Sequence, residues 1–130
     1  MTTDVTATLA DFAAGLKFED IPGHVRENCR ILLLDTLACA LAGHLGEETP
    51  QVAAMAGALG HSEELSIIGG GRSSLAGTTL LNGFLITAVT MCDVHRSTLT
   101  HITPEVVPPA LAIAERDGLS GRDLMVALVA

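Results

Sequence analysis

The side chains best suited to chemistry lie together in one short polar segment between two apolar stretches. Asp93, His95, Arg96 and His101 fall within nine residues. A histidine near its ordinary pKa can give or take a proton at neutral pH, and a neighbouring carboxylate can orient the imidazole. An arginine can hold a substrate carboxylate through two hydrogen bonds. The segment therefore predicts an acid–base site, although an ordinary solvated loop accounts equally well for its composition.

A metal site is the weakest interpretation of the same segment. Asp93 and His95 form an Asp-x-His pair, but a zinc site needs at least three protein ligands and no His-Glu-x-x-His pattern supplies them. Cys29, Cys39 and Cys92 form no Cys-x-x-Cys pair. We therefore interpret the cysteines as small core residues in a reducing compartment.

The other polar residues of interest are three histidines and one asparagine. His24, His44 and His61 lie in a charged helical turn or directly after a helix-ending glycine, where surface and capping roles are usual. Asn82 lies within an apolar helical stretch, where an amide is usually buried with its hydrogen bonds satisfied. It precedes Asp93 by several helical turns and can also face the same cleft, so it is kept as a candidate substrate-binding residue.

Helical periodicity dominates the chain and predicts an all-α fold. Apolar spacing and capping signals predict a first helix that begins at residue 6 or 8 and ends at residue 15. The same signals predict further helices over residues 22–43, 51–59, 75–92 and 105–116, and a last one from residue 120 onward. The segment near 63–72 is the one strand-like or turn segment. The helix over 22–43 is expected to be buried for its last three turns. The helix over 75–92 has apolar residues on nearly every side and is expected to be the most buried.

Two local patterns refine these expectations. Pro108 and Pro109 fit a helix only if they fall in its first turn, because proline has no amide hydrogen to donate. The run Gly69-Gly70-Gly71 before a helix is also found in phosphate-binding loops. No Gly-Lys-Ser or Gly-Lys-Thr ending follows it, so a flexible turn is favoured.

Composition excludes several classes of partner. Seven Lys and Arg against 15 Asp and Glu give a formal charge of −8, without a basic stripe to neutralise phosphates, so nucleic acid is not expected. A membrane span is not expected either, since it needs a run of about 18 apolar residues and the sequence has none. The first residues lack the basic start and apolar block of a signal peptide. A cytoplasmic location follows by default.

The sequence ends inside an apolar helix over 124–130, without a glycine, a basic last turn or a polar cap. Natural domains seldom stop in this way. We therefore expect residues 1–130 to be a truncated, N-terminal portion of a longer helical domain. We also expect such a chain to associate through its exposed apolar surface rather than to remain a monomer.

Several short motifs, taken in order, resemble the MmgE/PrpD family. They are the apolar run over 33–43, Leu81-Asn82-Gly83, Asp93-Val94-His95-Arg96, His101, Val106-Val107-Pro108 and the Gly-x-Ser-Gly-x-Asp-Leu segment over 118–124. No single motif is specific, whereas their order and spacing together are. The resemblance extends over nearly all 130 residues.

The resemblance implies a helical bundle-like part of the family's larger helical domain, whose second, smaller α+β domain is absent from this chain. The family includes 2-methylcitrate dehydratases, cis-aconitate decarboxylases and iminodisuccinate epimerases. Its members are usually dimers and require no metal or organic cofactor. They act on small di- and tricarboxylates by proton transfer next to a carboxylate.

The same resemblance assigns roles to the polar segment. His101 or His95 would move the proton, Asp93 would orient and charge the imidazole, and Arg96 would hold a carboxylate of the substrate. This chain also differs from the usual family pattern. Thr87 stands in place of a histidine, Thr90 and Cys92 in place of acidic residues, and Ile102 in place of a proline. The only lysine is Lys17, far from any position expected of the family's catalytic lysine.

Two hypotheses follow. The first is the N-terminal fragment of a cofactor-independent lyase or isomerase that is inactive by itself and acts on a small carboxylic acid once completed, as a homodimer or with a complementing chain. The second is a non-catalytic helical module for interaction or dimerisation. The retained residues of the polar segment favour the first, and the substituted ones favour the second.

Overall fold

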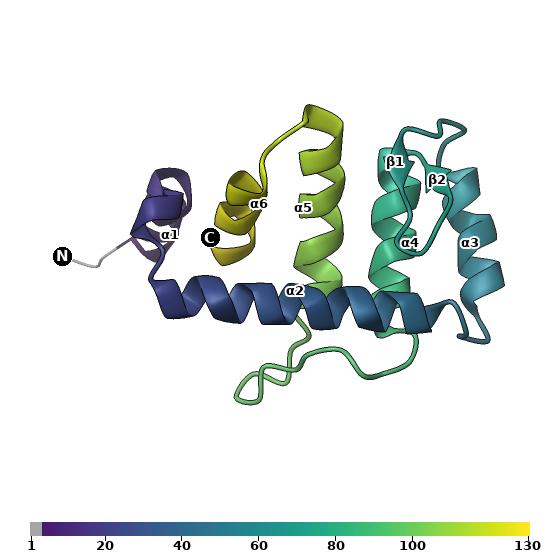
Figure 1. Ribbon diagram of the computed structural model, residues 1–130, viewed down its shortest axis with the longest axis horizontal. Coiled ribbons are helices and arrows are strands. Elements are labelled where there is room, and N and C mark those ends of the chain that lie inside the picture. The colour runs from purple at the N-terminus through teal and green to yellow at the C-terminus, as the bar shows by residue number, and fades with distance from the viewer. Residues whose placement is uncertain (1–3) are drawn as a thin grey trace.

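The computed structural model describes residues 4–130 as a row of short helices set along one long helix (Figure 1). The helices are α1 (Val5–Gly15), α2 (Gly23–Gly43), α3 (Thr49–Ala58), α4 (Leu75–Thr87), α5 (Thr103–Asp117) and α6 (Gly121–Val129), with a single 3-10 turn at Phe18–Asp20 and a hairpin of β1 (Leu65–Ser66) and β2 (Arg72–Ser73). This confirms the all-α prediction. Within the described residues, no helix has both the length and the apolar character needed to cross a membrane.

Side-chain caps set several of the helix ends. Asp4 accepts a hydrogen bond from the Ala7 amide, so α1 begins at Val5 rather than at the predicted threonines. Ser74 caps α4, and Ser120 with Asp123 forms a reciprocal capping box at the start of α6, as predicted. Gly118 ends α5 in the left-handed conformation, with φ of 63°, which costs glycine little.

Helix α4 lies between α2, α3 and α5 and supplies the centre of the core. Its buried residues outnumber those of every other described helix, which confirms the prediction made for this segment; they are Gly77, Thr78, Leu81, Asn82, Leu85 and Ile86. Its apolar side chains pack against Ala40 of α2 and Ala56 of α3. Because these neighbours are alanines, the helices approach closely and the core needs few large side chains.

Each of the three neighbouring helices meets α4 at a glycine. A Cβ on Gly43 of α2 would lie 2.0 Å from the Leu85 carbonyl oxygen. A Cβ on Gly77 would lie 2.6 Å from the carbonyl oxygen of Ala56 in α3, and one on Gly83 would lie 3.0 Å from that of Pro104 in α5. The backbones therefore touch at these points, and a side chain at Gly43 would force α2 and α4 apart.

The predicted end of α4 was wrong, because the helix stops at Thr87 and not at residue 92. The Thr90 amide donates to the Thr87 carbonyl oxygen, and Thr90 has a φ of 52°. The chain thus turns sharply out of the helix, and the following residues form a loop that leads into α5. The residues after Thr87 are still mostly apolar, so nothing in the sequence indicated that the helix ends there.

The prediction that α2 is buried over its last three turns was also wrong. Only the side facing α4 is buried there, at Thr36, Cys39, Ala40 and Gly43. Leu34 and Leu41, on the other side, are exposed. A helix at the edge of a bundle buries one face only, and apolar composition does not show which faces find a partner.

The sequence predicted that Pro108 and Pro109 fit a helix only in its first turn, and this prediction was wrong. The helix begins at Thr103, so Pro108 and Pro109 lie in its interior. Two backbone hydrogen bonds are therefore lost. Pro108 is almost fully buried, and Gly83 of α4 lies beside its ring, so its packing against α4 offsets part of that cost.

The strand-like segment forms half of a small antiparallel hairpin. Leu65 pairs with Ser73 and Ser66 with Arg72, and the second strand was not predicted. All three glycines of the connecting turn, at 69, 70 and 71, have positive φ angles. The triple glycine therefore serves as a turn between two strands, in agreement with the favoured interpretation of that run.

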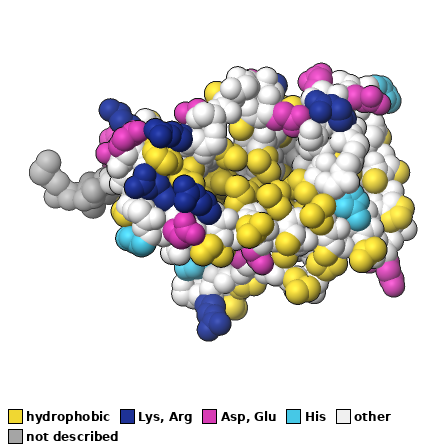
Figure 2. All heavy atoms as spheres, viewed as in Figure 1, with side chains coloured by type: hydrophobic (Ala, Val, Ile, Leu, Met, Phe, Trp, Pro, Cys, Tyr) yellow, Lys and Arg dark blue, Asp and Glu magenta, His cyan; other side chains and the backbone are white. Residues whose placement is uncertain are grey.

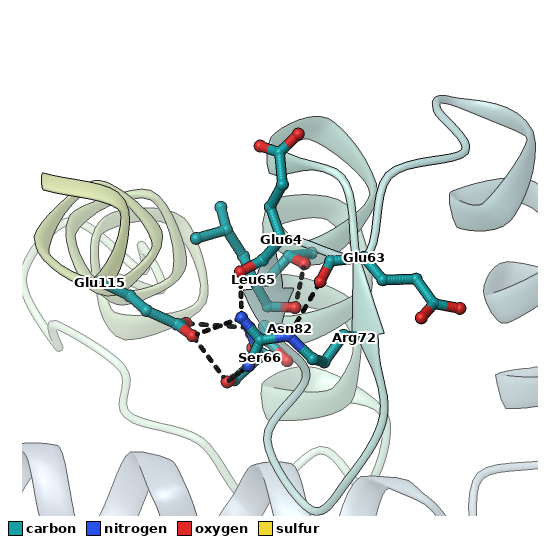
Figure 3. A network of polar contacts seen from close by, with 8 residues as sticks. Glu63, Glu64, Leu65, Ser66, Arg72, Asn82 and Glu115 are labelled. Atoms are coloured by element: carbon teal, nitrogen blue, oxygen red, sulfur yellow. Dashed lines mark hydrogen bonds and ion pairs between the residues drawn. The ribbon is translucent and has the colours of Figure 1, made fainter.

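A polar network joins this hairpin to α5 (Figure 3). Glu115 accepts hydrogen bonds from the Ser66 amide at 2.9 Å and from the Ser66 hydroxyl at 2.8 Å, and it pairs with Arg72 at 3.3 Å. Arg72 also donates to the carbonyl oxygens of Glu63 and Glu64. The Ser66 amide, followed by the Ser66 hydroxyl and Arg72, lowers the pKa of Glu115.

We predict that this network makes stability depend on pH at the acidic side. Because the pKa of Glu115 is lowered in the folded state, its contribution is fully present above the ordinary glutamate pKa and is lost as the pH falls through the lowered one. Glu115→Gln should lower the free energy of unfolding at pH 7, and its difference from the wild type should shrink as urea titrations are taken to pH 3. Glu63→Gln, whose side chain points away from the network in Figure 3, should follow the wild type. A constant difference for Glu115→Gln would contradict the assignment.

We further predict that Gly43→Ala destabilises the protein by at least about 2 kcal/mol, since the new methyl overlaps the Leu85 carbonyl. Gly57→Ala is a matched control, because Gly57 lies in α3 and no neighbouring atom lies within 4 Å of the place its new methyl group would take. That control should raise stability by up to about 1 kcal/mol through helix propensity. Urea denaturation measures both effects, and equal values for the two variants would refute the close contact between α2 and α4.

Candidate functional site

The candidate site is the loop between α4 and α5, residues 88–102. Its outer part is a tight hairpin in which the His95 amide donates to the Thr100 carbonyl at 2.9 Å and the Leu99 amide donates to the His95 carbonyl at 2.8 Å. Leu99 has a φ of 54°, a conformation that is uncommon outside glycine. The polar segment therefore has a defined shape, unlike a loosely solvated connection.

Asp93 connects the end of this loop to the start of α5 through hydrogen bonds. One oxygen of its carboxylate accepts hydrogen bonds from the Thr103 amide at 3.0 Å and from the Thr103 hydroxyl at 2.5 Å. Ile102, the residue before the helix, has no capping side chain, so Asp93 caps α5 from a distance of ten residues. A carboxylate is also favoured at the positive end of the helix dipole. The carboxylate does not contact either imidazole of the loop.

His101 is held by the backbone of Asp93 instead. Its Nδ1 lies 2.9 Å from the Asp93 carbonyl oxygen. A carbonyl only accepts hydrogen bonds, so Nδ1 carries the hydrogen, and in the neutral imidazole Nε2 is the basic nitrogen. The Cys92 sulfur lies 3.4 Å from the same Nδ1 and 3.5 Å from the Thr87 hydroxyl. The fold thus selects one tautomer of His101.

His95 has no such constraint. Its Nδ1 lies 2.8 Å from the Thr98 hydroxyl and 3.4 Å from the Ser97 hydroxyl. A hydroxyl can donate or accept, so these contacts fit either tautomer. Of the two histidines, His101 is therefore the one whose protonation pattern is fixed by the structure.

The two histidines line different hollows. His101 lines a groove of about 480 Å³ between α3, α4 and α5, together with Met55, Phe84 and Glu105. His95 and Asp93 line a separate pocket of about 300 Å³ between α2, α5 and α6, whose walls are mostly apolar. The four polar residues of the segment are therefore near one another in sequence without facing one common space.

Arg96 and Asn82 lie outside these two hollows. Arg96 is exposed in the turn of the loop hairpin and lines neither of them. Asn82 is 2% exposed; its amide oxygen accepts from the Ile68 amide at 2.9 Å, and its nitrogen donates to the Ser66 carbonyl at 3.2 Å. Both of its polar groups hold the hairpin that contains β1, so the structure favours the core-amide interpretation over substrate binding.

Two residues at the site were not foreseen. Cys92 was interpreted as a small core residue and as a replacement for an acidic residue of the family pattern, without a contact to His101, and Thr103 was placed before its helix. The Thr-Pro pair at 103 and 104 is a helix-start signal that could have identified Thr103.

Burial raises the pKa of the Cys39 thiol, and the carboxylates of Asp35 and Asp93 raise it further, so Cys39 stays protonated near neutral pH.

Comparison with known proteins identifies the family of the whole chain. Residues 7–130 match the MmgE/PrpD N-terminal domain. The chain belongs to the MmgE/PrpD family. It is 33% identical over 134 residues to the cis-aconitate decarboxylase-like protein oryM of Aspergillus oryzae, a match that covers 97% of this chain and 28% of that relative. No solved structure matches significantly.

Membership in the family agrees with the sequence resemblance. The chain spans 28% of the length of the relative that it matches, so the match concerns one helical part of that protein. Among residues 4–130, no group of three His, Cys, Asp or Glu side chains is arranged to hold a metal ion.

We predict that Asp93→Ala lowers the free energy of unfolding by about 1–2 kcal/mol, the usual cost of losing a helix cap. Asp11→Ala, an exposed aspartate of α1, should change it by less than about 0.5 kcal/mol. Hydrogen exchange should show faster exchange of the Thr103 amide in Asp93→Ala. Unchanged exchange at Thr103 would show that Asp93 does not cap α5.

Proposed function

We propose that this chain is the N-terminal helical part of a cofactor-independent lyase or isomerase. Its substrate is a small di- or tricarboxylic acid, and its reaction is proton transfer at the carbon next to a carboxylate, as in a dehydratase, decarboxylase or epimerase. The observation that carries the proposal is the fixed tautomer of His101, whose ring lines the groove between α3, α4 and α5.

In this proposal His101 is the base. With Nδ1 donating to the Asp93 carbonyl, Nε2 has a lone pair that can accept a proton from the substrate carbon. When the ring becomes an imidazolium, the Asp93 carbonyl keeps its hydrogen bond and lies against the new positive charge. The same ring can later return the proton to the substrate or to a leaving group, so it acts as base and then as acid.

The other residues have different proposed roles. Asp93 is a positioning residue, because its carboxylate fixes the loop to α5 and its carbonyl fixes the imidazole. His95 is a second proton carrier at the neighbouring pocket, and Arg96 is placed to meet a substrate carboxylate only if another part of the enzyme covers the loop hairpin. Asn82 is left out of the proposed site, because its amide is already engaged.

We propose that the chain alone is inactive and that other parts of a longer protein complete the groove. Its one lysine, Lys17, lies between α1 and α2, away from the loop. Loop residues 94–102 are exposed, so water screens their charges. The relative that it matches is several times longer, which leaves room for a second domain to cover the groove and supply further groups.

A second candidate function is a non-catalytic helical interaction module. Two observations favour it. The Asp93 carboxylate is committed to capping α5, and the Cys92 thiol, which lies beside His101 and Thr87, replaces an acidic residue that the family usually has, as Thr87 replaces a histidine. A module of this kind keeps the shape of the loop without turning over a substrate.

The test compares variants of a complete protein, in which this segment is joined to, or mixed with, the remaining domain. His101→Asn is expected to lower turnover of small tricarboxylates such as cis-aconitate by at least about 100-fold, the usual contribution of an acid–base residue. The asparagine amide can still donate to the Asp93 carbonyl, so the loop keeps its shape while Nε2 is removed. Product formation followed by NMR measures the loss.

His61→Ala is the control, because His61 is exposed on the segment between α3 and β1, and it should leave turnover near the wild-type level. The 130-residue chain alone should show no turnover. Full activity in His101→Asn would refute His101 as the base. If the complete protein turns over none of the di- and tricarboxylates, the interaction module becomes the better account.

A further inference from the structure

The thiol of Cys92 connects His101 to the last residue of α4. Its sulfur lies 3.4 Å from His101 Nδ1, and the thiol donates to the hydroxyl of Thr87 at 3.5 Å. Cys92 is 8% exposed and packs in the core beside α4. It lines neither the groove of His101 nor the pocket of His95, so it can affect a substrate only through the imidazole.

The hydrogens of these contacts have one consistent arrangement. Nδ1 of His101 carries a hydrogen, because it lies 2.9 Å from the Asp93 carbonyl oxygen. The thiol hydrogen is given to Thr87, so the lone pairs of the sulfur remain free to accept from Nδ1. The hydrogen on Nδ1 is therefore shared between a carbonyl oxygen and a sulfur atom, and both contacts favour the same tautomer.

A second acceptor matters at this ring because water can compete for Nδ1. The loop lies below α2 in Figure 1, and the space-filling view of Figure 2 shows it at the surface of the molecule. Residues 94–102, His101 included, are exposed, whereas Cys92 is buried. A hydrogen bond is stronger where water is excluded, so the buried sulfur holds Nδ1 from the side of the core.

We propose that Cys92 and Thr87 are positioning residues for His101. Thr87 accepts the thiol hydrogen, and the sulfur accepts the hydrogen on Nδ1, which leaves Nε2 unprotonated. This positioning role rests on the proposed function in one respect, because it affects turnover only if His101 is the base. The place of the ring hydrogen does not depend on that function and can be measured in the 130-residue chain without a substrate.

The first test measures the tautomer of His101 by long-range nitrogen–proton NMR, at a pH where the ring is neutral. Cys92→Ala should raise the ratio of the Nε2–H form to the Nδ1–H form at least about threefold, the effect of losing a weak hydrogen bond. Cys92→Ser keeps a group that can accept from Nδ1 and donate to Thr87, so it should retain the wild-type ratio. Cys29→Ala, the same change at a half-buried cysteine of α2, should also leave the ratio unchanged.

The second test changes the partner of the thiol and leaves the sulfur in place. In Thr87→Val the side chain keeps nearly the same shape but cannot accept a hydrogen bond. The freed thiol can then donate to Nδ1 of His101, which requires that Nδ1 carry no hydrogen, so the Nε2–H form should again increase at least about threefold. Thr87→Ser keeps the acceptor and should retain the wild-type ratio.

Two results of these NMR measurements would overturn the positioning role. One is an unchanged tautomer ratio in both Cys92→Ala and Thr87→Val. The other is a Cys92→Ser variant that differs from the wild type as much as Cys92→Ala does, because the packing of Cys92 in the core would then explain the effect.

Turnover of a complete protein separates this role from the proposed function. Cys92→Ala should lower kcat about threefold and leave KM unchanged, because the thiol positions the base and does not meet the substrate. If His101→Asn keeps full activity, the proposed function fails, and the tautomer ratios still decide the positioning role. If His101→Asn abolishes turnover while Cys92→Ala changes neither the tautomer nor kcat, only the positioning role fails.

Discussion

Helices α2, α3 and α5 each approach α4 so closely that their backbones are in contact. Gly43, Gly77 and Gly83 bring α2, α3 and α5 against α4 so that a carbonyl oxygen lies where a side chain would otherwise stand. The chain has only three aromatic residues, so its core relies on many close contacts between small side chains. The positions of α3, α4 and α5 in turn define the groove that His101 lines.

The loop obtains its shape from the same framework. The chain leaves α4 at Thr87, turns at Thr90 and is fastened to the start of α5 through Asp93 and Thr103. This places the Asp93 carbonyl beside the His101 ring, and the tautomer of that ring follows. A residue that the sequence suggested as an electrostatic partner of the imidazole thus acts through its backbone, while its carboxylate supports the helix.

Much of the fold was predictable because it depends on local rules. Helical spacing gave the all-α fold and the buried α4, and the capping residues Ser74 and Ser120 gave two helix starts. Two predictions that needed knowledge of neighbouring elements were wrong, because the exposed face of α2 and the place of Pro108 in α5 depend on packing partners. The end of α4 was wrong because a local turn at Thr90 interrupts a stretch of apolar composition. At the site, the types of residue in the segment from Asp93 to His101 indicated that acid–base chemistry can occur there. They could not show that His95 and His101 line different hollows, because a tight hairpin separates the two rings.

The hydrogen bond from His101 to the Asp93 carbonyl places the hydrogen of the neutral ring on Nδ1, and we propose that Nε2 is the base. Long-range nitrogen–proton correlation NMR of the uniformly labelled 130-residue chain reports the tautomer of each histidine directly. The spectra are recorded at a pH high enough for the histidine rings to be neutral. We predict a protonated Nδ1 and an unprotonated Nε2 for His101, and a less biased mixture for His95, whose partners are hydroxyls. A hydrogen on Nε2 of His101, with Nδ1 unprotonated, would contradict it.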